Sequence, residues 1–416
     1  MNKNPETQHF IDLEYNYGAH NYKPIPVVLS KGEGVYLWDV DGKKYFDFLS
    51  AYSAVNQGHC HPEILKVLNS QANKLTLTSR AFYNDVLGVY EKYITDLFKY
   101  DKVLAMNTGV EGGETAIKLA RKWGYLKKKI PHNEARIVFA NGNFWGRTLA
   151  AISSSDDPSS YKDFGPYMPG YDIIPYNDLI SLEEKLKNHN TAAFMIEPIQ
   201  GEAGVIVPDE GYLSSVRLLC SKYNVLLIID EVQTGLGRTG KMLASDYEKV
   251  RADILILGKA LSGGVLPSSA VLANDEIMLC INPGEHGSTF GGNPLASSVC
   301  MAALKVIVDE NLSNNSYLLG EKFRSSLKSY IDKSSIVLSI RGKGLLNAIE
   351  IDNNKKNDLA WDICLKLKEK GLLAKPTHGN IIRFAPPLVI TEEELDKCIQ
   401  IITSTLKIYE ESKIEI

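Results

Sequence analysis

A lysine and an aspartate each stand just beyond a strongly apolar run of the chain. Lys259 follows the run 254–257 by two residues, and Asp230 closes the run 225–229. If both runs are strands of one parallel sheet, the two side chains converge beyond its carboxyl edge, where ligands of open α/β sheets bind. A lysine can form a Schiff base with the aldehyde of pyridoxal 5'-phosphate, while a carboxylate keeps the pyridine nitrogen protonated. The pair therefore predicts an amino-acid enzyme that uses this cofactor.

A glycine-rich turn at 106–113 precedes a helical pattern that continues to residue 121. Backbone N–H groups at a helix start form an anion site, and Gly109 lets the backbone approach a phosphate closely. An ordinary turn and helix cap explains the same residues, because glycines before helices are common. The presence of Asp230 and Lys259 favours the phosphate site.

A second glycine-rich segment, 235–242, matches two loose nucleotide-binding patterns, G-x-G-x-x-G and G-x-x-x-x-G-K. Met242 stands where a phosphate-binding loop needs a hydroxyl for Mg²⁺, and only a brief helical pattern follows. We therefore favour a flexible surface loop. A nucleotide-binding protein using Gly235 to Gly240 is kept as the alternative function from a different class. A colourless protein that cannot be reconstituted with the cofactor would refute the prediction of a pyridoxal-phosphate enzyme.

The composition indicates an ordinary protein with more than one domain. The chain has 416 residues, is 44% hydrophobic and 23% charged, and carries a formal net charge of -4. This length exceeds one usual core, and the charge offers no basic field for nucleic acid. The six cysteines form no C-x-x-C pair, the start is polar, and no apolar run is long enough for a membrane span. These features predict a cytoplasmic location with no membrane partner, and His59 and His61 fall short of a metal site.

The pattern changes along the chain and predicts three parts. Residues 1–60 form an N-terminal segment with turn signals, 61–305 a large cofactor-binding domain, and 306–416 a small C-terminal domain. In the second part, short β-rich runs alternate with helical stretches, which implies crossovers and a mainly parallel sheet. The expected strands are 136–140, 192–196, 225–229, 254–257, 347–351 and 381–384.

Several longer stretches carry a family resemblance. Residues 230–235 (Asp-Glu-Val-Gln-Thr-Gly) and 258–264 (Gly-Lys-Ala-Leu-Ser-Gly-Gly) resemble the signature of class III, pyridoxal-phosphate-dependent aminotransferases. Within this class the chain is closely similar to the members that act on ornithine, over about residues 12–405. The resemblance implies the α/β fold type I of these transferases, with a large domain and a smaller α+β domain built from the chain termini. It also implies a homodimer with active sites at its interface, and a role in proline and arginine metabolism.

The resemblance assigns cofactor roles to particular residues. Lys259 would hold the cofactor and then move the proton during transfer, and Asp230 would pair with the pyridinium nitrogen. The other implied cofactor-binding residues are Gly109 and Val110 at the phosphate, Phe144 on the ring, Gln233 at the phenolic oxygen, and Ser288 and Thr289 at the phosphate of the neighbouring subunit.

The resemblance also implies two substrates with different charges. The δ-amino group of L-ornithine would pass to 2-oxoglutarate by a ping-pong mechanism, giving glutamate 5-semialdehyde and glutamate. Arg383 would bind the α-carboxylate of 2-oxoglutarate, and Glu202 would neutralise Arg383 while ornithine is bound. Ornithine's carboxylate would meet Arg147 and Tyr22, with Tyr52 lining the pocket.

Each of these five side chains, taken alone, is more often a surface or packing residue, so the motif context carries their assignment. The alternatives within the class are an acetylornithine or a GABA aminotransferase. Tyr22 separates them, because other class III members generally lack this tyrosine. A non-catalytic relative of the fold is disfavoured by the intact Lys259, Asp230 and Arg383.

Overall fold

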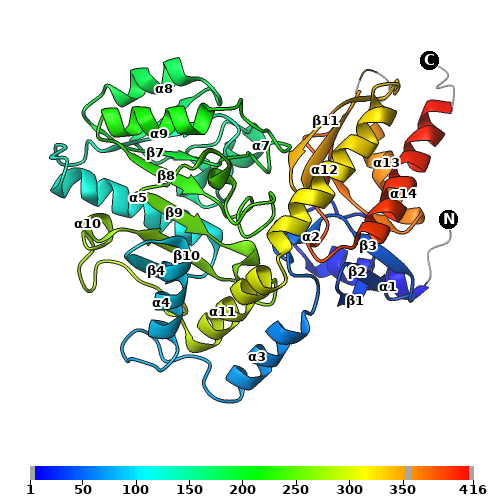
Figure 1. Ribbon diagram of the computed structural model, residues 1–416, viewed down its shortest axis with the longest axis horizontal. Coiled ribbons are helices and arrows are strands. Elements are labelled where there is room, and N and C mark those ends of the chain that lie inside the picture. Colours follow the sequence, from blue (N-terminus) through cyan, green and yellow to red (C-terminus); the bar gives the residue numbers. More distant parts are fainter. Residues whose placement is uncertain (1–4, 353, 355–357, 412–416) are drawn as a thin grey trace.

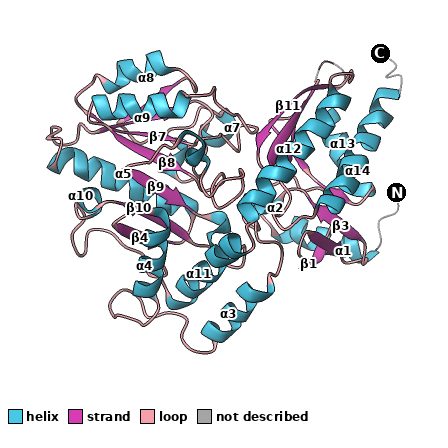
Figure 2. Ribbon diagram, in the orientation of Figure 1, coloured by secondary structure: helices cyan, strands magenta, loops and turns pink. Residues whose placement is uncertain are grey.

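The computed structural model describes residues 5–352, 354 and 358–411. Figure 1 shows two regions side by side: one contains a large central sheet, and the other combines the N-terminal and C-terminal parts of the chain. Figure 2 shows helices on both sides of the large sheet, whereas the second region carries its long helices along one side. Among the residues described, no helix has the length and apolar character needed to cross a membrane.

The large sheet has seven strands in the order β4-β10-β9-β8-β7-β5-β6. The strands from β9 to β6 pair in parallel, and only β10 runs antiparallel to its neighbours β4 and β9. The predicted α/β class with a mainly parallel sheet is therefore confirmed. The strands are β4 (Lys102–Met106), β5 (Arg136–Ala140), β6 (Tyr171–Ile174), β7 (Thr191–Ile196), β8 (Leu226–Asp230), β9 (Ile254–Leu257) and β10 (Ser269–Ala273).

Both faces of this sheet are buried, as the continuous apolar runs of its strands require. In β8, Leu227 and Ile229 pack into the hydrophobic cluster on one face, and Leu226 and Ile228 into the cluster on the other. The helical elements of this region are α3 (Pro62–Ala72), α4 (Leu87–Phe98), α5 (Gly109–Leu126), α6 (Leu149–Ile152), α7 (Pro158–Tyr161), α8 (Leu179–Leu186), α9 (Tyr212–Lys222), η1 (Ala244–Glu248), η2 (Lys259–Ser262), α10 (Asp275–Met278) and α11 (Pro294–Asp309).

The second region joins the two ends of the chain through two four-stranded sheets, β1-β2-β3-β13 and β11-β12-β15-β14. The strands are β1 (Leu29–Glu33), β2 (Tyr36–Asp39), β3 (Lys44–Asp47), β11 (Val337–Lys343), β12 (Leu346–Ile351), β13 (Leu372–Leu373), β14 (Lys375–Thr377) and β15 (Ile381–Phe384). The helices are α1 (Pro5–Tyr17), α2 (Ser50–Ser53), α12 (Leu312–Ile331), α13 (Leu359–Glu369) and α14 (Glu392–Glu411). β13 pairs in parallel with β3, so residues more than three hundred positions apart share a sheet.

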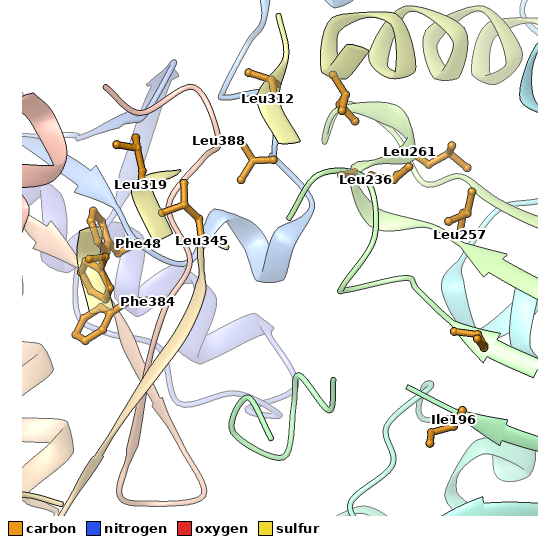
Figure 3. Close-up of a cluster of buried hydrophobic side chains, with 14 of the residues drawn as sticks. Phe48, Ile196, Leu236, Leu257, Leu261, Leu312, Leu319, Leu345, Phe384 and Leu388 are labelled. Atoms are coloured by element: carbon orange, nitrogen blue, oxygen red, sulfur yellow. The ribbon is translucent and has the colours of Figure 1, made fainter. Parts of the chain in front are cut away.

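Aromatic packing fixes this junction. Phe48 lies close to Phe384 and Phe323, with ring centroids 6.0 and 6.3 Å away. Figure 3 shows Phe48 and Phe384 together in the buried cluster, with Leu345 from the turn before β12 close by. The N-terminal chain is thus packed against a strand and a helix from the C-terminal part. The predicted domain boundaries stay a prediction, and the one after residue 305 lies within α11.

The prediction of a flexible surface loop at 235–240 was wrong. All six residues are buried, and Arg238 is fully buried. The guanidinium of Arg238 donates to Asn56 Oδ1 and to the backbone oxygens of Leu345 and Pro386. Small residues let the segment pack between the two regions, which composition alone does not reveal. The short 3₁₀ helix η1 follows it, so the context that a nucleotide loop needs is missing here.

Candidate active site

Three adjacent parallel strands deliver ionisable side chains to one edge of the large sheet. Glu197 follows β7, Asp230 is the last residue of β8, and Lys259 lies two residues beyond β9. The expected convergence of Asp230 and Lys259 is therefore present in the structure. The three side chains line a cavity of about 220 Å³. The other residues that line it are Gly109, Val110, Phe144, Trp145, Gly146, Val232 and Gln233.

Burial sets the protonation of these three groups. It raises the pKa of the Glu197 carboxyl to about 8, with a further contribution from the Asp230 charge. It raises the pKa of Asp230 to about 6, although the Val232 N–H and Lys259 favour the ionised form. Burial lowers the pKa of Lys259, against the attraction of nearby carboxylates. Burial therefore favours the protonated form of Glu197 more strongly than that of Asp230, and it makes the amine of Lys259 easier to deprotonate than in water.

The start of α5 adjoins the same cavity. Thr108 caps the helix: its Oγ1 accepts from the Glu111 N–H, and the Glu111 carboxylate accepts from the Thr108 N–H. A side chain at Gly109 would meet Val232 at 3.0 Å, and one at Gly146 would meet Val110 at 2.4 Å. The backbone around the helix start is therefore closely packed, and its glycines leave room that a side chain would fill. A helix N-terminus beside a cavity suits a phosphate group.

The rest of the cavity also fits pyridoxal phosphate. Phe144 offers an aromatic face, and its N–H donates to Glu197 Oε1 at 3.0 Å, which fixes its position. The Gln233 amide lies against Gly201, where an added Cβ would stand 2.1 Å from Gln233 Oε1. The cavity thus combines the groups that this cofactor needs: a lysine, an aspartate, an aromatic ring, an amide and a helix N-terminus.

Arg383 and Glu202 form an ion pair beside this cavity. Arg383 Nη1 donates to Glu202 Oε2 at 2.8 Å and to the Gly201 carbonyl at 3.2 Å. The Arg383 side chain is buried, whereas that of Glu202 is 29% exposed. Within the described residues, the buried Arg383 Nε has no hydrogen-bond partner. The predicted pair is therefore together, with donor capacity left over on the arginine.

Tyr52 packs beside Arg383, and its backbone has an unusual conformation. Its ring centroid lies 5.0 Å from Arg383 Cζ. Tyr52 belongs to α2, whose four residues Ser50–Ser53 all have positive φ, between 45° and 71°. Non-glycine residues in this left-handed region are strained and cluster at functional sites. The turn directs Tyr52 toward the arginine from the N-terminal part of the chain.

The other two predicted substrate residues lie on the surface of the chain, outside the cavity lining. Arg147 and Tyr22 are exposed, and Tyr22 is 69% exposed. Arg147 Nη1 donates to Ser160 Oγ at 3.3 Å, and its Cζ lies 5.5 Å from the Phe144 ring centroid. Tyr22 faces Lys375, whose Nζ lies 5.8 Å from the Tyr22 ring centroid. Neither Arg147 nor Tyr22 lines the cofactor cavity.

Ser288 and Thr289 also lie outside that lining. Ser288 Oγ accepts from Asn107 Nδ2 at 2.8 Å, two residues before α5 begins, and Thr289 is exposed. The structure therefore places this loop against the helix start of its own chain without bringing it into the cavity.

Sequence reasoning gave no role to Glu197, Trp145 or Gly146. Glu197 had the same signal as Asp230, since it directly follows an apolar strand that is now seen to neighbour β8. Trp145 and Gly146 carried no comparable signal, because their place in the cavity depends on a loop that crosses the sheet edge.

Comparison with known proteins agrees with this geometry. The family model described as aminotransferase class III matches residues 17–406. The mitochondrial ornithine aminotransferase of Drosophila melanogaster is 66% identical, over 94% of this chain and 90% of the relative. The solved ornithine aminotransferase of Toxoplasma gondii ME49 superposes with a TM-score of 0.97 at 48% identity, covering 99% and 97% of the two chains. The acetylornithine aminotransferase of Elizabethkingia anophelis gives 0.89 at 57% identity, covering 98% and 100%. The chain belongs to the class III aminotransferases.

Proposed function

We propose that this protein is an ornithine aminotransferase, which transfers the δ-amino group of L-ornithine to 2-oxoglutarate with pyridoxal phosphate as cofactor. The products are glutamate 5-semialdehyde and glutamate, formed in two half-reactions. The observation that carries the proposal is the Glu202–Arg383 pair beside Lys259, because it can present a neutral or a cationic surface to successive substrates.

The bound cofactor supplies an electron sink that makes the C–H bond next to the substrate nitrogen acidic. The Asp230 carboxylate lines the cavity, where it would hold a proton on the ring nitrogen of the cofactor. The Lys259 amine, whose pKa is lowered by burial, would accept the proton from the substrate carbon that carries the amino group. Glu197 accepts N–H bonds from Phe144 and Gly201, so it fixes the loops on both sides of the reacting groups.

The ion pair gives a physical reason for accepting two substrates. While Glu202 pairs with Arg383, the buried guanidinium is neutralised, and the aliphatic chain of ornithine can approach without facing an unpaired charge. When the α-carboxylate of 2-oxoglutarate enters, it replaces Glu202 and makes the strong charge-assisted bonds that arginine offers to carboxylates. Arg147 and Tyr22 would bind the distant carboxylate of ornithine, and Tyr52, beside Arg383, would line the pocket.

The assembly and the location belong to the same proposal. The protein acts as a homodimer in which Ser288 and Thr289 of one subunit reach the cofactor phosphate of the other. The cytoplasmic location stays a prediction, and the Drosophila relative carries "mitochondrial" in its name.

The rival substrate is N-acetylornithine, since one similar solved structure bears that name. The test compares kcat/KM for ornithine, N-acetylornithine and GABA in the wild type and in Tyr22→Ile. We expect ornithine to be preferred, and Tyr22→Ile to lower the ornithine-to-GABA ratio by about tenfold, the cost of one lost hydrogen bond to a charged group. Tyr17→Ile, at an even more exposed tyrosine nearby, is the matched control. A wild type that prefers N-acetylornithine, or an unchanged ratio in Tyr22→Ile, would refute the assignment.

A further inference from the structure

A second cation lies beside the Glu202–Arg383 pair, and the proposed function leaves it without a role. Lys375 on β14 stands directly opposite Arg383 on β15 in the antiparallel register. Residues opposite each other in such a pair project from the same face, with Cα atoms about 4.5–5.5 Å apart. The side chains of Lys375 and Arg383 therefore project side by side from one face of the sheet, where Arg383 contacts Glu202 and Lys375 faces Tyr22.

The surroundings of Lys375 show that it feels the same carboxylate. Lys375 is half-buried, and this burial lowers the pKa of its amine. The Glu202 charge opposes that shift, and the Arg383 charge adds to it. The Lys375 amine also faces the Tyr22 ring. The ammonium thus lies within electrostatic reach of Glu202 but has Arg383 as a competitor for it.

When Arg383 binds another carboxylate, the Glu202 carboxylate loses its ion-pair partner. Its Oε2 is bonded to Arg383 in the structure, and its side chain is largely covered. A partly buried carboxylate that loses its partner is costly. Glu202 also lines a cavity of about 290 Å³ together with Asp156, Asp157 and His378. A move of its carboxylate toward the two aspartates brings like charges together, and among the described residues His378 is the one basic side chain in that lining. A cation on the Arg383 side offers a better destination.

We propose that Lys375 is a specificity-determining residue that receives the Glu202 carboxylate when an oxo acid takes Arg383. This proposal rests on the two-substrate function above and extends it. Lys375 stabilises the arrangement in which Arg383 is free, so it favours binding of a dicarboxylate without contacting that ligand. The ornithine half-reaction, in which Glu202 stays on Arg383, does not depend on it.

The test measures the two half-reactions of the holoenzyme separately, by cofactor absorbance, in Lys375→Met and Lys375→Arg. Calorimetric titration with glutarate, an unreactive dicarboxylate, adds a binding measurement that needs no turnover. We expect Lys375→Met to raise KM for 2-oxoglutarate and Kd for glutarate by about tenfold. This factor lies between the effects of losing an exposed and a buried ion pair. Its kcat/KM for ornithine should stay within about twofold, and Lys375→Arg should bind glutarate as the wild type does.

Lys343→Met is the matched control, because Lys343 is a half-buried lysine on β11 of the same sheet whose amine faces the Tyr247 ring. Equal losses for ornithine and 2-oxoglutarate, or unchanged glutarate binding in Lys375→Met, would overturn the role of Lys375. His378 is the rival partner, since its Nε2 lies 3.1 Å from the Glu202 carbonyl oxygen. A tenfold loss confined to His378→Gln would assign the role to His378. A wild type that does not react with ornithine would refute the proposed function instead, whatever its glutarate affinity.

Discussion

At the scale of single residues, the Glu197 carboxyl at the centre of the site has a raised pKa. Its carboxyl accepts backbone N–H groups from Phe144 and Gly201, which usually lower an acid's pKa. Burial and the neighbouring Asp230 outweigh these bonds and raise the pKa to about 8. Glu197 therefore holds its proton more tightly than Asp230, which leaves Asp230 as the carboxylate that can balance a positive ring nitrogen. The two acids differ because their surroundings differ.

The raised pKa of Glu197 predicts how stability changes with pH. In the unfolded chain this carboxyl ionises near its ordinary value of 4.5, whereas in the folded chain it holds its proton up to about 8. The folded state therefore binds more protons in that window, and stability falls as pH rises, by at most about 1.4 kcal/mol per pH unit from this group. Glu197→Gln keeps the acceptor oxygen and removes the titration. We expect the cofactor-free variant to lose less stability than the wild type between pH 5 and 8, measured by thermal unfolding.

Asp230 and Glu231, whose pKa values are also raised by burial, remain in both proteins, so the difference between the two slopes reports Glu197 together with its coupling to Asp230. Parallel stability curves for Glu197→Gln and the wild type would show that Glu197 is ionised in the folded protein.

At the scale of elements, the strand ends could be predicted and the loops could not. Apolar runs located β5, β7, β8, β9, β12 and β15 to within a residue, because burial on both faces leaves a continuous hydrophobic signal. Asp230 and Lys259 followed directly from those strands. The segment 235–240 and the left-handed turn Ser50–Ser53 escaped prediction, since their conformations are imposed by distant residues that pack against them. Local composition carries no record of such contacts.

Arg238 shows how strongly one such loop is held. Its guanidinium bonds Asn56, which lies four residues beyond Tyr52, and the Pro386 carbonyl, three residues beyond Arg383. Arg238→Met would leave three buried neutral acceptors unsatisfied, and at about 1–3 kcal/mol for each such group we expect it to lower the free energy of unfolding by about 3–5 kcal/mol. Urea unfolding of the holoenzyme measures this change.

Arg217→Met is the comparison, because Arg217 pairs with Asp253 at a partly exposed site and should cost about 1 kcal/mol or less. If the two variants unfold at the same urea concentration, the Arg238 contacts contribute no more than a surface ion pair.

At the scale of the whole molecule, the site needs both ends of the chain. Tyr52 comes from the N-terminal part, Arg383 from the C-terminal part, and the pairing of β3 with β13 holds these parts together. Such long-range pairing is not encoded by local pattern, so the sequence alone gave these side chains no common location apart from the family resemblance. Several large aromatic side chains are exposed in the described part of the single chain, among them Tyr15, Tyr17, Tyr22, Phe82, Tyr83, Phe164 and Phe290.

Phe290 directly follows Ser288 and Thr289 in the chain and is exposed, which is consistent with a surface that a second copy covers. If Ser288 and Thr289 act across a dimer interface, two defective subunits can complement each other. Lys259→Ala lacks the reacting amine, and the double variant Ser288→Ala, Thr289→Ala would bind the cofactor phosphate about tenfold or more weakly. A mixed dimer contains one site with a native Lys259 and native Ser288 and Thr289 from the partner. An equimolar random mixture should therefore regain about a quarter of wild-type activity at limiting cofactor, since half of its dimers are mixed. If these two residues serve their own chain, every site in the mixed dimer carries a defect, and mixing gives no gain over the double variant alone.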